Sequence, residues 1–250
     1  MRYFIDTEGN DDEAYREAMQ TACRLADENT EIKRVVILIS AKGVDGWFDR
    51  LYGSETVKQL YKGIKFSNCN PIFKFETQRT YKDTHKPSEL VITCGLDSED
   101  VLKIDNYYSI IGIIAIPWLS NSLNKWVQTW SAENLRGEVA AAAYPEPSCI
   151  VRKALIELTE SINMSTGIHH PSDEELAKTS ILSLHKYETS IDADIVGAYL
   201  VRELGWNTKH AKDIETLINT LNKGKFFKGG TRTGLQHSYN RWKEECQNNA

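Results

Sequence analysis

Three largely apolar runs constrain the fold of this chain more than any other feature. They are RVVILIS (34–40), ELVITCG (89–95) and IIGIIAIPW (110–118). A strand with one face in water alternates apolar and polar residues, so runs without this alternation predict strands that are buried on both faces. Such strands are typical of parallel sheets that carry helices on both sides.

Helical patterns separate these strands. Residues 11–27 place apolar side chains at helical spacing, and the same holds for residues 121–130. Residues 97–105 begin with an acidic first turn, which favours a helix start. RYFID (2–6) predicts a further strand, and the alternating PIFKFETQRTY (71–81) predicts an edge strand. The sequence therefore predicts the α/β class, with a Rossmann-like, mostly parallel sheet flanked by helices.

The second part of the chain has a different pattern. AAAAYPEPSC (140–149) marks a boundary between a domain at 1–140 and an all-helical domain at 149–250. Helices are predicted at 149–163, 172–187, 192–204 and 207–222. The short turn before the last of these is typical of a helix-turn-helix arrangement, and the segment 222–234 then forms a basic loop.

The charge is unevenly distributed. The whole chain carries −5, whereas its last fifty residues carry nine Lys and Arg against five Asp and Glu. A basic end on an acidic body indicates contact with a polyanion or a phosphate, or alternatively an ordinary solvated surface. The candidate side chains for phosphate or nucleic acid are Lys209, Lys212, Lys223, Lys225, Lys228 and Arg232.

Several classes of site and location are disfavoured. The longest apolar run, at 109–119, is too short to cross a bilayer, so no membrane contact is expected. The five cysteines are odd in number and include no CxxC pair, which argues against a zinc ribbon or a disulfide framework and favours a reducing cytoplasm. No GxGxxG follows a strand, so no dinucleotide is expected.

Acidic residues follow the first predicted strand, in the stretch DTEGNDDE (6–13). Ligands of parallel sheets bind at the carboxyl ends of strands, and clustered carboxylates there suit Mg²⁺ or Ca²⁺. A bound cation activates water for hydrolysis. We therefore expect metal ligands at Asp6, Glu8 and Asp11, and catalytic carboxylates at Asp6, Asp12 and Asp97. The alternative is that the acidic stretch at 6–13 and the acidic first turn of 97–105 only cap helices.

This stretch resembles the N-terminal signature of nucleoside hydrolases. The resemblance implies that Asp6, Asp11 and Asp12 hold a calcium ion and ribose hydroxyls. Here Glu8 replaces an aspartate, and one residue is missing between Glu8 and Gly9. FIDTE (4–8) is also similar to the first acidic strand end of PIN- and NYN-type nucleases, and TCGLDSED (93–100) would supply a second acidic group.

A broader similarity covers most of the chain. The stretches GWFDRLYGSETVKQLYKG, IIAIPWLSNSLNKWVQTW and NMSTGIHHPSDEELAKTSILSLH resemble uncharacterised bacterial proteins with a Rossmann-like half and a helical tail. The resemblance supports the fold and leaves the function open. Trp118, Trp126 and Trp130 are expected to pack in the core or, alternatively, to stack on a base.

Three functions follow from these features. The first is a metal-dependent hydrolase acting on a nucleoside, a nucleotide or a nucleic acid, with a small phosphate-containing or nucleoside ligand and a divalent cation. The second is a nucleic-acid-binding module that uses the basic helical tail. The third is a noncatalytic sensor or interaction protein. The sequence leaves open whether the chain is an enzyme, and which oligomeric state it adopts.

Overall fold

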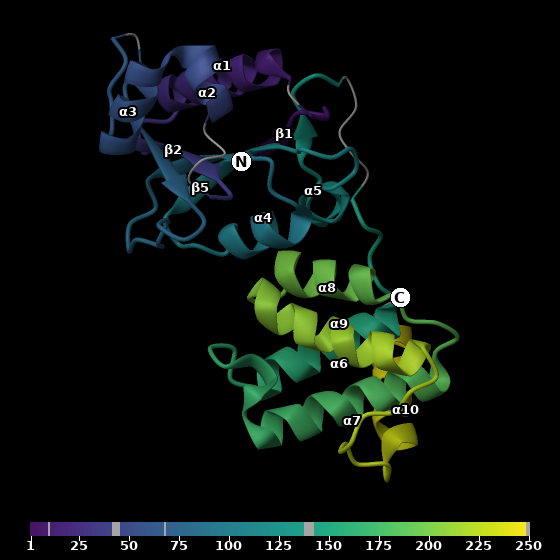
Figure 1. Ribbon diagram of the computed structural model, residues 1–250. Coiled ribbons are helices and arrows are strands. Elements are labelled where there is room, and N and C mark those ends of the chain that lie inside the picture. Colours follow the sequence, from purple (N-terminus) through teal and green to yellow (C-terminus); the bar gives the residue numbers. More distant parts are fainter. Residues whose placement is uncertain (10, 42–45, 68, 138–142, 249–250) are drawn as a thin grey trace. The chain divides into compact units, whose positions relative to one another are not determined.

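The protein forms two compact units, Met1–Ala143 and Tyr144–Ala250 (Figure 1). The computed structural model describes residues 1–9, 11–41, 46–67, 69–137 and 143–248, so residues 140–142 of the expected boundary lie outside the described residues. The first unit is an α/β structure and the second is helical, which confirms the predicted fold class.

The first unit is built on a six-stranded sheet of order β3-β2-β4-β5-β1-β6, in which all the strand pairings between described residues are parallel. The three apolar runs form the neighbouring strands β2, β4 and β5, and the alternating run forms the edge strand β3, as predicted. The strands are β1 (Arg2–Phe4), β2 (Arg34–Ile39), β3 (Ile72–Thr77), β4 (Glu89–Cys94), β5 (Ile110–Ile116) and β6 (Glu133–Asn134).

Helices cover both faces of this sheet (Figure 1). On one face, Ile37 and Ile39 of β2 share a buried cluster with Ala18. On the other face, Val36 and Leu38 share a second buried cluster with helices that follow β4 and β5. The first face carries α1 (Asp12–Glu28), α2 (Gly46–Tyr52) and α3 (Ser54–Lys62), and the second carries α4 (Ser98–Ile104) and α5 (Asn124–Trp130).

This arrangement creates crevices at the carboxyl edge of the sheet. Strand β2 is followed by α2 on one face, while its neighbour β4 is followed by α4 on the other. The same holds for the adjacent strands β1 and β5, which are followed by α1 on one face and by α5 on the other. Where adjacent strands send their chains to opposite faces, the strand ends separate, and open α/β sheets bind ligands there.

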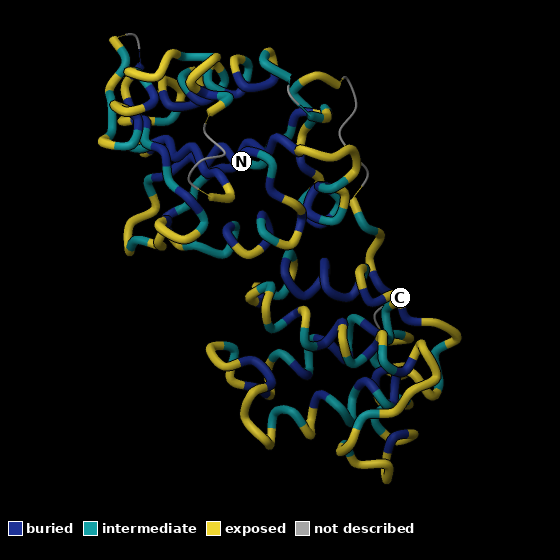
Figure 2. The backbone as a smooth tube through the Cα atoms, in the orientation of Figure 1, coloured by how far each residue is buried: buried dark blue, intermediate teal, exposed yellow. Residues whose placement is uncertain are grey.

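The second unit buries its core between helices, seen as the dark inner faces in Figure 2. Trp206 and Trp242 are almost fully buried, and their indole N–H groups donate to Thr159 Oγ1 (2.8 Å) and Glu157 Oε2 (2.7 Å). No helix within the described residues is long and apolar enough to cross a membrane. The helices are α6 (Cys149–Ser161), η1 (Gly167–His169), α7 (Pro171–Tyr187), α8 (Ala193–Arg202), α9 (Thr208–Asn222) and α10 (Leu235–Gln247), of which α10 was not predicted.

Each unit contains one disulfide, and this corrects the expectation that no disulfides form. Cys23 pairs with Cys69 across 46 residues of sequence, with Cα atoms 5.4 Å apart. Cys149 pairs with Cys246 across 97 residues, with Cα atoms 6.0 Å apart. Both pairs join residues that only the tertiary fold brings together, so their spacing in the sequence gave no sign of them.

Candidate functional site

The acidic segment after β1 lies along the carboxyl edge of the sheet. Two backbone hydrogen bonds hold it there, from Ile5 N–H to Ala115 O (3.0 Å) and from Gly9 N–H to Trp118 O (2.8 Å). These bonds fix the segment beside the end of β5. The side chains of Asp6 and Glu8 are exposed, and they make no hydrogen bond or ion pair with the described residues.

Asp11 is the most heavily engaged carboxylate of the segment. It is the N-cap of α1, where Oδ1 accepts the Ala14 N–H at 3.1 Å. Its Oδ2 accepts the Thr7 hydroxyl at 2.7 Å and forms an ion pair with Arg136. The Arg136 guanidinium, followed by the Thr7 and Ala14 donors, holds the pKa of the Asp11 carboxyl well below its usual range despite partial burial.

Asp12 is held by α2. The Arg50 guanidinium donates to both carboxylate oxygens, at 2.8 Å to Oδ2 and 2.5 Å to Oδ1. The Trp47 indole N–H donates to Oδ1 at 2.8 Å. Arg50, and after it Trp47, lowers the pKa of Asp12 from its ordinary value, so this carboxylate is ionised at neutral pH.

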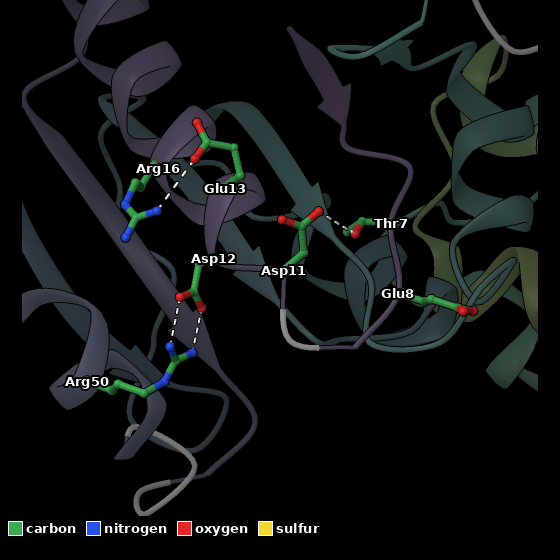
Figure 3. A pocket seen from close by; sticks show the side chains of 7 residues that line it. All are labelled: Thr7, Glu8, Asp11, Asp12, Glu13, Arg16 and Arg50. Carbon is green, nitrogen blue, oxygen red and sulfur yellow. Dashed lines mark hydrogen bonds and ion pairs between the residues drawn. The ribbon is translucent and has the colours of Figure 1, made fainter.

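These side chains line an open depression of about 790 Å³ (Figure 3). Its lining carries four carboxylates and two guanidinium groups, so negative charge is in excess. The lining residues are Thr7, Glu8, Asp11, Asp12, Glu13, Arg16 and Arg50. The depression therefore offers many hydrogen-bond acceptors and favours neutral or cationic ligand groups over anionic ones.

A smaller apolar cavity of about 100 Å³ lies beside the depression. The two are connected by one hydrogen bond: the Trp47 ring lines the cavity, and its indole N–H donates to Asp12, which lines the depression. The cavity occupies the crevice between β2 and β4, where the strand ends Ile39 and Cys94 meet the aromatic side chains of Tyr15, Trp47, Phe48 and Trp118.

Aromatic contacts set the shape of this cavity. The rings of Tyr15 and Trp47 meet edge-on with centroids 3.8 Å apart. Trp118, whose side chain lies against Gly95, is 45% exposed and forms the open side. Gly95 has φ +71°, a backbone conformation that favours glycine. The cavity thus has aromatic walls, and solvent reaches the wall formed by Trp118.

The cavity offers no ready nucleophile. Cys94 is the cysteine outside the two disulfides, and burial raises the pKa of its thiol well above the usual range. Burial likewise raises the pKa of the Tyr15 hydroxyl. Both groups therefore stay protonated at neutral pH, and the cavity wall is uncharged.

The expected metal ligands Asp6, Glu8 and Asp11 are not gathered at one point. In Figure 3, Glu8 and Asp12 lie on opposite sides of Asp11, and each carboxylate points away from the others. Among the residues that the structure describes, no group of three or more His, Cys, Asp or Glu side chains could hold a metal ion. The carboxylates of Asp11 and Asp12 instead contact arginines.

Asp97 is placed apart from the first acidic segment. It is the N-cap of α4 and accepts the Asp100 N–H at 3.0 Å. Strand β5 separates its strand, β4, from β1, so the two strand ends are about 10 Å apart at the usual strand spacing. The structure thus brings Asp12 and Asp11 to one depression and leaves Asp97 outside it.

Sequence reasoning missed the cationic and aromatic partners. Arg136 follows the two-residue strand β6, which is too short to show a pattern, and its contact with Asp11 spans 125 residues. Trp47 and Arg50 stand three residues apart on α2, and this helical spacing was the available signal that both reach the same neighbour.

The three tryptophans lie in different surroundings. Trp126 is fully buried, and its indole N–H donates to Asp105 at 2.9 Å, so it packs in the core. Trp130 is half-buried, with the Arg2 guanidinium 3.8 Å from its ring centroid. Trp118 alone of these three lines the cavity.

The basic residues of the second unit fall into two places. Lys209 and Lys212 lie in the first turns of α9, near the His169–Asp213 pair (3.6 Å). Lys223, Lys225, Lys228 and Arg232 lie beyond the last turn of α9, in the connection to α10. A helix of this length separates the two groups by about 20 Å.

Comparisons with known proteins bear on the second unit. Residues 147–243, less than half of the chain, match the model of a family described as Domain of unknown function (DUF1889). The similarity to uncharacterised proteins is thus confirmed for the helical region, which carries no assigned activity. No curated protein and no solved structure matches the chain.

Proposed function

We propose that the first unit binds a nucleoside at the carboxyl edge of its sheet. The observation that carries the proposal is the hydrogen bond from Trp47 to Asp12 (2.8 Å), which links a side chain that lines the aromatic cavity to one that lines the carboxylate-rich depression. A nucleoside has matching parts, a flat heterocycle and a sugar with several hydroxyl donors. The site also lies in the crevice where open α/β sheets hold ligands.

The polarity of the cavity suits an aromatic ring that enters it in part. Its volume of about 100 Å³ is smaller than the about 150 Å³ of an apolar cavity that encloses benzene, so the ring would extend past the exposed side chain of Trp118. Trp118, exposed on one side, supplies a face for stacking. The base would enter this cavity and leave the sugar in the depression.

The charge of the depression favours a nucleoside over a nucleotide. Three of the four carboxylates, those of Asp11, Asp12 and Glu13, are paired with arginines, and Glu8 supplies the excess negative charge. A phosphate would meet excess negative charge, whereas sugar hydroxyls donate to carboxylates such as that of Glu8. We therefore place the neutral nucleoside first among the ligands expected from the sequence.

Calorimetric titration with the four ribonucleosides and their 5′-monophosphates tests this proposal. We expect a nucleoside to bind and its monophosphate to bind more weakly. Trp118→Ala should weaken binding about fivefold or more, because it removes a stacking face. Tyr108→Ala is the matched control: Tyr108 is an aromatic residue that is 65% exposed and lies just before β5, at the opposite edge of the sheet.

Two outcomes would contradict the proposal. One is the absence of binding for all four nucleosides at millimolar concentration. The other is tighter binding of the monophosphates, which would show that the arginines and not the carboxylates dominate the depression. An equal loss in Trp118→Ala and Tyr108→Ala would place the ligand elsewhere.

We also propose, as a second candidate, hydrolysis of the bound nucleoside with Mg²⁺ or Ca²⁺. Asp6 and Glu8 support it, because both are exposed and lack partners among the described residues. Asp11 is unfavourable for cation binding, because both of its carboxylate oxygens already accept hydrogen bonds and one is paired with Arg136. Release of free base with either cation, lost in Asp6→Asn, would support hydrolysis. No release and no cation-dependent rise in Tm would rule it out.

The cysteine pairs bear on location. Disulfides persist in oxidising compartments and are rare in the cytosol. The cytoplasmic location expected from the sequence relied on unpaired cysteines, and four of the five are paired. Cytoplasmic location therefore stays a prediction, and the ratio of free thiols to disulfides in freshly isolated protein would test it.

A further inference from the structure

The connection between α9 and α10 concentrates positive charge on an exposed loop. Between residues 223 and 234 it carries three lysines and one arginine and no acidic residue. All four of these cations are exposed. We call this segment, Lys223–Gly234, the basic loop.

Tertiary hydrogen bonds hold the basic loop in a defined position on α7. Lys178 donates to Lys228 O at 2.6 Å, the Gly230 N–H donates to Glu175 Oε2 at 2.8 Å, and the Thr231 N–H donates to Thr179 Oγ1 at 2.9 Å. All three contacts use the backbone of the loop. The charged side chains of the loop therefore take no part in the three hydrogen bonds that anchor it.

Two glycines make this close approach possible. Gly229 and Gly230 have φ of +93° and +81°, which disfavours other residues. A Cβ at Gly229 would collide with Glu175 Oε1, and one at Gly230 would come within 2.8 Å of Leu182 Cδ1. The loop backbone is therefore fitted against α7, and its lysines are left on the outer side.

The surroundings do not neutralise the loop. On α7, Glu174 is paired with Lys178 at 2.7 Å, and Glu175, which accepts the Gly230 N–H, keeps one negative charge against the four cations of the loop. The last turn of α9 and the first turn of α10 carry no acidic residue. The surface therefore keeps a net positive charge.

An aromatic ring stands in the middle of this charge. Phe226 is 72% exposed, the highest value among the large apolar side chains that the structure describes as exposed. The Arg232 guanidinium lies 5.7 Å from its ring centroid. Exposing a phenylalanine is unfavourable for a free surface, so a flat ligand that covers this ring gains apolar contact and cation–π contact together.

From this combination we infer that the basic loop binds single-stranded nucleic acid. Such surfaces combine backbone-tracking cations with an aromatic ring on which a base stacks. Lys223, Lys225 and Lys228 would contact phosphates, and Phe226 would stack on a base. A duplex hides its base faces and could use only the lysines.

The same features favour a nucleic acid over a membrane. A membrane-binding loop buries several apolar side chains beneath the headgroups. Here Phe226 is the only large apolar side chain of the loop that is exposed, since Phe227 is half-buried with Lys178 about 6.0 Å from its ring. One exposed ring among four cations suits a base stacked between phosphates.

Fluorescence anisotropy on the full chain tests this inference, with a labelled thymidine oligonucleotide of about 15 nucleotides and the matching duplex. We expect the single strand to bind more tightly. The logarithm of affinity should fall linearly with the logarithm of the salt concentration, with a slope of about −2 from about three phosphate contacts. Lys223→Gln with Lys225→Gln should reduce that slope by about 1.4.

Variants of Phe226 separate stacking from charge. Phe226→Ala should weaken single-strand binding about fivefold or more and leave the salt slope unchanged, and Phe226→Trp should restore or exceed wild-type affinity. Lys243→Gln is the matched control for charge, because it removes an exposed cation of α10 that lies outside the basic loop. It should leave binding unchanged.

Four results would overturn the inference. They are no binding at low salt, equal binding of duplex and single strand, equal losses in Lys243→Gln and in the loop variants, or Phe226-dependent binding to vesicles containing phosphatidylserine without binding to the oligonucleotide. A circular dichroism spectrum identical to that of the wild type ensures that each variant is folded.

Discussion

The two charged segments differ in whether their own charges are paired. In the first unit, backbone hydrogen bonds at Ile5 and Gly9 hold the acidic segment, and its charges are engaged as well, as Asp11 pairs with Arg136 and Asp12 with Arg50. In the second unit, the basic loop is fixed through its backbone, and its cations stay exposed. Paired charges contribute to stability, whereas exposed unpaired charges are available to a ligand. Charge density in a sequence does not distinguish these two cases.

The largest expected effect concerns the disulfides, in which the two units should behave alike. By chain entropy, the cross-link across 97 residues contributes up to about 4.7 kcal/mol and the one across 46 residues up to about 4 kcal/mol. Cys149→Ala with Cys246→Ala should therefore speed amide exchange throughout the second unit, and Cys23→Ala with Cys69→Ala throughout the first, as measured by mass spectrometry.

Cys94→Ala is the matched control for these variants, because it removes a buried sulfur that belongs to neither disulfide. Its effect should be smaller and confined to the sheet edge. If one disulfide can be removed without faster exchange in its own unit, the prediction that both units are stabilised by their disulfides is wrong.

The next effect separates the two acidic helix starts. Asp11 and Asp97 both cap a helix, but Asp11 also pairs with Arg136. Asparagine keeps the cap and loses the charge. Asp11→Asn should lower the free energy of unfolding by about 1.5–3 kcal/mol, the range for hydrogen bonds to charged groups, and Asp97→Asn by about 0.5 kcal/mol or less. Urea unfolding measures both, and equal losses would mean that the arginine pair contributes nothing.

The pH dependence of stability follows from the same pair. Arg136 holds the pKa of Asp11 below its ordinary value in the folded state. Its contribution is therefore complete above the unfolded pKa and is lost as the pH falls through the folded one. Wild type should lose stability between about pH 5 and pH 2 more steeply than Asp11→Asn. Urea unfolding across this range measures the slopes, and parallel slopes would contradict the role given to Arg136.

Much of the fold followed from local patterns in the sequence. The runs at 34–40, 89–95 and 110–118 carry their own burial signal, because strands buried on both faces cannot alternate. The caps Asp11 and Asp97 were visible as a carboxylate just before a helical pattern. These features depend on neighbours within a few residues, which a single sequence displays.

Other features depend on strand order and on distant contacts. Asp12 lines the depression and Asp97 does not, because β5 lies between β1 and β4. The partner Arg136 and the disulfides join residues 46–125 positions apart. No local pattern encodes such distances, so the sequence located the acidic segment and missed what neutralises it.

The smallest expected effect tests the other half of the comparison. If the basic loop is held by its backbone, its lysines contribute little to folding. Lys223→Gln with Lys225→Gln should change the free energy of unfolding by no more than about 0.5 kcal/mol, the usual range for surface changes. By contrast, Glu175→Gln replaces the charged acceptor of the Gly230 N–H, so it should speed proteolysis of the loop and leave amide exchange in α6 unchanged.

A loss above about 1 kcal/mol in the lysine variant would show that these cations, like the arginines paired with Asp11 and Asp12, stabilise the fold. The two units would then use their charges in the same way, and an exposed basic loop would no longer indicate a binding surface.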